Sequence, residues 1–120
     1  MLIDKHYSVL EYQPIDFIKK YNLNFIAGNI VKLCSRFDTT DRSDLTKEAQ
    51  FERIRFYLKN TIENLNIIYY SDKPNINEFL DKNKFKSGED RVLLYYFASL
   101  EFKNPSFIQY LLKHLEFILK

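Results

Sequence analysis

Four side chains in the first third of the sequence have the types and the spacing of a binding site for an anionic group. Phe25, Asn29, Lys32 and Arg36 follow one another at intervals of four, three and four residues, which places them on one face of an α-helix. That face presents an aromatic ring, an amide and two cations, and such groups bind phosphates or carboxylates. We therefore take this face as the candidate binding site.

Further cations occur on the next helix that the sequence predicts. Arg53, Arg55 and Lys59 would lie near this face if the two helices pack against one another, and we include Arg53 and Arg55 in the candidate site. The alternative is an ordinary polar helix surface, on which the cations form salt bridges to Asp16 or Glu52. The sequence alone leaves both interpretations open.

The last predicted helix carries a second face of aromatic residues beside its leucine stripe. Phe107, Tyr110, His114 and Phe117 recur at intervals of three, four and three residues. A helix that is apolar on two sides is either enclosed by the core or covered by a partner. Tyr110, His114 and Phe117 are therefore a second candidate interface, which a homodimer or another protein would cover.

The sequence has no recognisable pattern of catalytic or metal-binding residues. Gly28 and Gly88 are too far apart to form a phosphate-binding loop, and neither His6 nor His114 has neighbouring metal ligands. Cys34 lies within a predicted helix without a nucleophile motif, so we expect a small buried side chain there. We expect no catalytic residue, no bound metal and no cofactor.

Composition limits the class of protein further. The net charge of +2 is spread evenly along the chain, which argues against binding polyanions over the whole surface. The single cysteine excludes an intramolecular disulfide and fits a reducing compartment. We see no signal peptide and no apolar run of about 20 residues, the length that spans a bilayer. We therefore expect a cytoplasmic protein.

The aromatic content, 17% with 11 Phe and 9 Tyr, is high for a chain of 120 residues. A small core does not hide that many tyrosines, so we expect several at the surface, where half-covered rings favour binding. The alternative is that the base composition of an A+T-rich genome raises Phe and Tyr together with Asn, Ile and Lys.

Helix-start signals recur along the chain, whereas glycine and proline are scarce. Helices are expected over residues 14–21, 25–37 and 45–70, with Pro14 in the first turn of the first helix and Asn24 as the N-cap of the second. The last five residues of the third helix favour β structure, so a strand there is the alternative.

Two capping boxes predict the helices that follow. Asn75 with Glu78 would start a short helix, and Ser87 with Asp90 would start a longer one, because a cap side chain pairs with backbone N–H groups that the first turn leaves unpaired. The last helix would begin at Asn104 and Pro105.

These elements predict an all-α protein. We expect a single domain over residues 1–120, built as a compact bundle of five to six helices with a long central helix. Residues 1–13 would form an irregular segment, and residues 75–120 a C-terminal helical part. The predicted core between the second and third helices consists of Ile30, Leu33, Ile54, Leu58 and Leu65.

Residues 6–60 contain a series of short motifs. These are His6-Tyr7, Pro14-Ile15-Asp16-Phe17-Ile18, Phe25-x-x-Gly28-Asn29-Ile30-Val31-Lys32 with Arg36, Asp44-Leu45-x-Lys47-x-Ala49 and Tyr57-Leu58. Together they resemble the SaV-like family of small phage and prophage proteins of unknown function. The resemblance implies a mobile-element origin, and with it a role in the contest between phage and host.

Two classes of function fit these observations. The first is a non-catalytic binding protein that docks on a host protein or ribonucleoprotein and inhibits or modulates it, for example a nucleic-acid-guided defence nuclease such as a CRISPR effector. Nucleic acid would then be reached through the partner, and no membrane is involved. The alternative is a nucleotide- or phosphate-binding accessory protein of phage metabolism, or a helical nucleotide-processing enzyme, in which Asn29, Lys32 and Arg36 hold phosphate. The small size, the missing catalytic pattern and the many tyrosines favour the first class.

Overall fold

Six α-helices make up the part of the chain that the computed structural model describes, which is residues 10–37, 46–66 and 72–119. No strand occurs within these ranges, so the prediction of an all-α bundle of five to six helices is confirmed. The helices are α1 (Pro14–Tyr21), α2 (Phe25–Ser35), α3 (Lys47–Glu63), α4 (Ile76–Asn83), α5 (Glu89–Phe102) and α6 (Ser106–Ile118).

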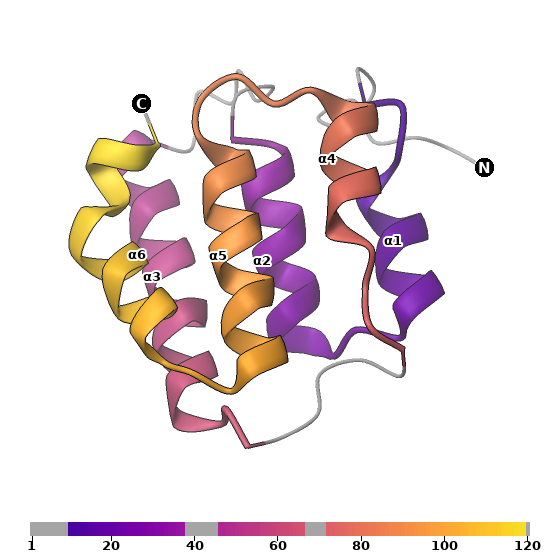
Figure 1. The fold of residues 1–120 in the computed structure, drawn as a ribbon. Coiled ribbons are helices and arrows are strands. Elements are labelled where there is room, and N and C mark those ends of the chain that lie inside the picture. Colours follow the sequence, from indigo (N-terminus) through magenta and orange to yellow (C-terminus); the bar gives the residue numbers. More distant parts are fainter. Residues whose placement is uncertain (1–9, 38–45, 67–71, 120) are drawn as a thin grey trace.

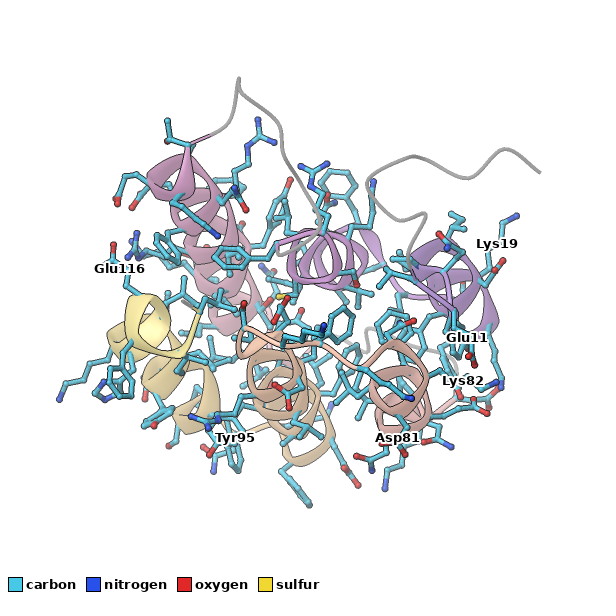
Figure 2. The ribbon with its side chains drawn as sticks, turned by 90° about the horizontal axis from the view of Figure 1, so that it is seen from above. Glu11, Lys19, Asp81, Lys82, Tyr95 and Glu116 are labelled. Carbon is cyan, nitrogen blue, oxygen red and sulfur yellow. The ribbon has the colours of Figure 1, made fainter. Side chains whose placement is uncertain are left out.

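The helices form two layers, each made by one half of the chain. Helices α1, α2 and α3 lie side by side in one layer and α4, α5 and α6 in the other, and neighbouring helices run antiparallel (Figure 1). Seen from above, α1 faces α4, α2 faces α5 and α3 faces α6 (Figure 2). The longest helix, α3, has 17 residues and lies at an edge of its layer. The middle positions belong to α2 and α5.

Short polar side chains cap the starts of three helices. In each case a side-chain oxygen accepts a hydrogen bond from the backbone N–H three residues later, which satisfies a donor that the first turn leaves open. The predicted caps Asn24 and Asn75 are confirmed, and Thr46 caps α3 in the same way. The bonds are Asn24 to Ala27 (2.9 Å), Thr46 to Ala49 (3.1 Å) and Asn75 to Glu78 (3.1 Å).

The predicted capping box of Ser87 and Asp90 is wrong. Helix α5 starts one residue later, with Gly88 as its N-cap at a φ of 90°, and the Ser87 N–H donates to the Glu89 carboxylate at 2.6 Å. A Cβ atom on residue 88 would lie 2.0 Å from the carbonyl oxygen of Ile118. The close approach of the end of α6 therefore requires glycine at this helix start.

The second and third helices end earlier than predicted. Helix α2 ends at Ser35, and α3 ends at Glu63 rather than near Tyr70. Asn64 follows α3 as its C-cap, and its amide nitrogen donates to the Asn60 carbonyl at 2.8 Å. Asparagine competes in this way with the helical backbone. The alternative strand is predicted at residues 66–70. Asn66 lies in a turn, and residues 67–70 lie outside the described residues, as does most of the irregular N-terminal segment.

One hydrophobic core joins the two layers, and the five residues predicted for it are all buried. Their exposed fractions lie between 0% and 9%, and the helices that carry most of them, α2 and α3, pack together. A polar contact also crosses the core: the hydroxyls of Thr61 on α3 and Tyr96 on α5 lie 3.0 Å apart.

Aromatic rings fill the end of the core between α1 and α4. The Phe17 ring has centroid distances of 4.8–5.9 Å to four others, those of Tyr12, Tyr21, Phe79 and Phe97. Next to them, the side chain of Asn83 accepts from the Tyr12 N–H at 2.8 Å and donates to its carbonyl at 2.9 Å. Asn83 thus ties the segment before α1 to the end of α4.

None of the described helices is both long and apolar enough to cross a membrane.

Leu58 tests the packing between the layers. Its side chain is 0% exposed, so Leu58→Ala leaves a cavity and should lower the free energy of unfolding by roughly 2–5 kcal/mol. Urea denaturation followed by circular dichroism measures this. Leu94→Ala is the matched control, because Leu94 is 37% exposed and its truncation should cost far less. A loss below about 0.5 kcal/mol for Leu58→Ala would contradict its place in the core.

The two glycines should respond to alanine in opposite directions. Gly88→Ala forces a side chain into the left-handed region and against the Ile118 carbonyl, so we expect a loss of roughly 2 kcal/mol or more in unfolding free energy. At Gly28, in α2, a Cβ would meet only the Ile18 side chain at an ordinary 3.6 Å. Gly28→Ala should therefore stabilise the protein by about 0.5–1 kcal/mol. Thermal or urea unfolding of both variants measures the two changes in unfolding free energy. Equal changes for the two variants would contradict this geometry.

Candidate functional site

A hollow of about 200 Å³ opens between α2 and α3 on the outer side of the first layer. It brings together four of the residues predicted for the site, namely Asn29, Lys32, Arg36 and Arg53. Leu33, which is buried, lies among them, and Phe56 and Tyr57 complete the lining. The predicted convergence of α2 and α3 is therefore observed for Arg53.

The helical repeat explains why these side chains meet. Asn29, Lys32 and Arg36 lie on the face of α2 that neither α1 nor α5 covers, at intervals of three and four residues. On α3, Arg53, Phe56 and Tyr57 follow the same spacing and so share one face. Because α2 and α3 pack side by side, the two faces border one hollow.

Three aromatic rings form a row beside the hollow: Phe56 and Tyr57 line it, and Phe25 contacts Tyr57. Phe25 is 73% exposed, and its ring centroid lies 6.0 Å from that of Tyr57. Phe56 is 59% exposed, and its ring centroid lies 5.2 Å from that of Tyr57. Sequence reasoning identified Phe25 and missed Phe56 and Tyr57. The signal that would have found them is their spacing of three and four residues from Arg53. Together with the four polar residues, these rings are called the α2–α3 surface below.

The charged residues that line the hollow are all cations, as far as the structure describes them. Among the described residues no carboxylate lines this hollow, whereas the hollows beside α4 and at the start of α5 include Glu101 and Asp90. Within residues 10–37, 46–66 and 72–119, no ion pair involves Lys32, Arg36 or Arg53. These cations are available to bind an anionic group, because no described carboxylate neutralises them.

Among the described polar residues that line the hollow, Asn29 is the one whose side chain makes a hydrogen bond. Its amide nitrogen donates to the backbone carbonyl of Phe25 at 2.7 Å. The amide oxygen is then the acceptor that Asn29 can offer to a ligand. The hollow thus combines three cationic donors with the amide acceptor of Asn29.

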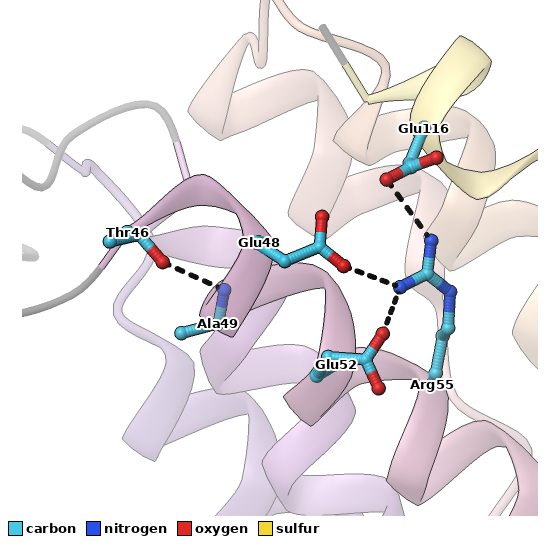
Figure 3. A network of polar contacts seen from close by, with 6 residues as sticks. All are labelled: Thr46, Glu48, Ala49, Glu52, Arg55 and Glu116. Carbon is cyan, nitrogen blue, oxygen red and sulfur yellow. Dashed lines mark hydrogen bonds and ion pairs between the residues drawn. The ribbon is translucent and has the colours of Figure 1, made fainter.

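Arg55 is not part of this surface and instead links α3 to α6. Its guanidinium group contacts the carboxylates of Glu52, of Glu48 at 3.7 Å and of Glu116 on α6 at 3.4 Å (Figure 3). The group also lies 5.7 Å from the centre of the Phe51 ring. Successive helical positions differ by about 100°, so two arginines two residues apart point to different sides. The salt bridge to Glu52 that the alternative interpretation expected forms here.

The second candidate interface is divided in the structure. The rings of Tyr110 and His114 lie 4.7 Å apart, and Tyr110 also contacts Tyr95 on α5 at 5.5 Å between centroids. Phe117, 69% exposed, instead borders the hollow at the start of α5. The backbone of His114 is not helical, with φ −117° and ψ 16°. This break separates the last turn of α6 from the face that carries Tyr110.

The described residues offer no assembled metal centre. No group of three or more His, Cys, Asp or Glu side chains within them is placed to hold a metal ion. Glu78 and Asp81 on α4 have the spacing of helix-borne ligands, but Glu78 pairs with Lys20 at 3.8 Å and with Lys82 at 4.0 Å. His6 lies outside the described residues.

Cys34 is buried in α2, as predicted. Burial raises the pKa of its thiol far above the ordinary value, and the negative charge of Glu89 adds to the shift. The thiolate is the nucleophilic form of cysteine, so the surroundings of Cys34 suppress the reactive species.

Comparison of the chain with protein-family models, with curated proteins and with solved structures finds no match.

Because burial disfavours its thiolate form, the thiol of Cys34 should be unreactive in the folded protein. At pH 8 we expect no reaction with Ellman's reagent on the time scale in which the urea-unfolded protein reacts completely, since unfolding exposes the thiol and returns its pKa to the usual range. The absorbance of the coloured thiolate that the reagent releases reports the reaction rates of the folded and of the unfolded protein. Equal rates in the folded and unfolded protein would show that Cys34 is accessible.

Proposed function

We propose that this protein acts by binding a partner through the α2–α3 surface and does not itself catalyse a reaction. The observation that carries the proposal is the gathering of Lys32, Arg36 and Arg53 around one hollow that no described carboxylate lines, beside the exposed rings of Phe25 and Phe56. Arginine and aromatic side chains are enriched in interfaces and supply much of their binding energy. A surface that served only solubility would place acids among these cations.

The size of the hollow favours docking over nucleotide processing. A volume of about 200 Å³ is below the roughly 300–1,000 Å³ of typical small-molecule pockets. It admits a phosphate or a carboxylate group but not a whole nucleoside triphosphate. The recognised group would therefore belong to a larger partner that lies across the surface.

The partner we propose is a host protein or ribonucleoprotein in the cytoplasm. The resemblance of residues 6–60 to SaV-like phage proteins supports a mobile-element origin, and small proteins of such elements gain from blocking host machines. A nucleic-acid-guided defence nuclease, such as a CRISPR effector, has both the acidic surfaces and the nucleic-acid backbone that guanidinium groups bind.

The alternative function is the binding of nucleotide or phosphate in phage metabolism, and the three cations of the hollow favour it. It requires saturable binding of a nucleoside triphosphate and, for an enzyme, turnover with magnesium. Turnover that disappears on charge reversal at Lys32 and Arg36 would establish this alternative in place of docking.

Charge reversal tests the docking surface. Lys32→Glu combined with Arg36→Glu should weaken partner binding by well over tenfold, because two attractive contacts become repulsive. The partner is identified by affinity purification from the natural host and its binding is then measured with the purified components. The far-ultraviolet circular dichroism spectrum should stay helical.

The matched control is Lys19→Glu combined with Lys113→Glu, which makes the same change in net charge at exposed positions on α1 and α6. This control should bind like the unmodified protein. Unchanged binding of the Lys32 and Arg36 variant would contradict the proposal and would move the interface to the aromatic residues of α6, around Tyr110.

A further inference from the structure

We propose that the α2–α3 surface binds single-stranded RNA, with a phosphate in the hollow and bases on the flanking rings. This inference rests on the proposed function and names the chemistry that the surface recognises in its partner. It starts from the combination of cations with exposed aromatic rings, which is the usual composition of surfaces that hold unpaired strands.

The exposed rings provide places for bases. Phe25 and Phe56 are 73% and 59% exposed, and each contacts Tyr57 at interplanar angles of 66° and 84°. Tyr57 is half-buried and lines the hollow, so it supports the two phenylalanines from between them. Large apolar rings are costly to leave in water. Stacking with bases removes that cost without requiring a particular sequence.

The hollow provides the place for a phosphate. Lys32, Arg36 and Arg53 line a hollow of about 200 Å³, which admits a phosphate group. Each nucleotide brings one phosphate and one flat ring, at a regular interval along the strand. The surface presents the same two kinds of group side by side, because the cations of the hollow adjoin Phe56 and Tyr57, and the row of rings continues from Tyr57 to Phe25. An acidic protein segment would satisfy the cations but has no regular partner for the rings.

The acceptor of Asn29 favours RNA over DNA. With its nitrogen donating to the Phe25 carbonyl, Asn29 offers an amide oxygen at a hollow whose other polar groups are mostly donors. A phosphate has only acceptors and cannot use this oxygen. A ribose 2′-hydroxyl can donate to it, and this hydroxyl is the group that distinguishes RNA from DNA.

Three phosphate-binding cations and a net charge of +2 predict weak binding that depends strongly on salt. For single strands the slope of log K against log salt is about −0.7 for each neutralised phosphate, or about −2 here. Raising the salt from about 50 to about 200 mM should thus weaken binding roughly twentyfold.

The experiment is fluorescence anisotropy of the whole protein with a labelled RNA of mixed sequence and about ten nucleotides, within the length that one small module covers. The same sequence as single-stranded DNA and as duplex RNA provides the comparison. We expect the single-stranded RNA to bind at least severalfold more tightly than either. The salt slope should be near −2, and Arg53→Ala should reduce its magnitude by about 0.7.

Phe25→Ala and Phe56→Ala should each weaken RNA binding by about fivefold or more, since each removes a stacking surface. Phe102→Ala and Phe117→Ala are the matched controls, because these rings are 66% and 69% exposed on other surfaces. The controls should bind like the unmodified protein. Circular dichroism confirms that all four variants remain folded.

Three results would overturn the inference. They are RNA binding without salt dependence, Phe25→Ala and Phe56→Ala variants that bind like their controls, and DNA that binds as tightly as RNA. If RNA fails to bind while charge reversal at Lys32 and Arg36 still abolishes partner binding, the occupant is an acidic protein surface. The proposed function would then stand and this inference would fall.

Discussion

Helix α2 is enclosed on three sides, by α1, α3 and α5, and the rest of the structure depends on this enclosure. Seven of its eleven residues are buried, including Gly28 and Cys34, so one side of the helix is left for its large polar side chains. Asn29, Lys32 and Arg36 lie there because charged groups are rarely buried without a partner. The candidate site is in this sense a consequence of the packing that holds the layers together.

The two arginines of α3 illustrate how one helix serves both stability and binding. Arg55 meets three carboxylates and an aromatic ring and ties α3 to α6. Such a network stabilises the fold more than an isolated surface ion pair, which contributes about 0–1 kcal/mol to the free energy of unfolding. Arg53, two residues earlier, has no ion pair among the described residues and borders the hollow. Helical phase alone separates the structural arginine from the candidate binding arginine.

The many aromatic residues serve two purposes. At the α1–α4 end of the molecule, Phe17 and the rings around it pack as core, and a biased base composition would be harmless there because large rings fill volume well. Other rings are exposed, among them Phe25, Phe56 and Phe117. The exposed rings that adjoin the positive hollow, Phe25 and Phe56, are the ones for which we propose a function in binding. We propose none for Phe102, since nothing in the structure gives it a role.

The sequence by itself determined the helical class, most helix starts and the core residues of the second and third helices, because periodic apolar spacing and capping are local. It also placed Asn29, Lys32 and Arg36 on one face. Tertiary structure decided the contacts between residues distant in the chain: Arg53 joins the hollow and Arg55 does not, and Thr61 meets Tyr96 across the core. The start of α5 shows most clearly where local sequence signals fail to predict the structure. Ser87 has the local chemistry of a cap, yet the carbonyl of Ile118, thirty residues away in the sequence, excludes any side chain at position 88 and moves the cap to Gly88.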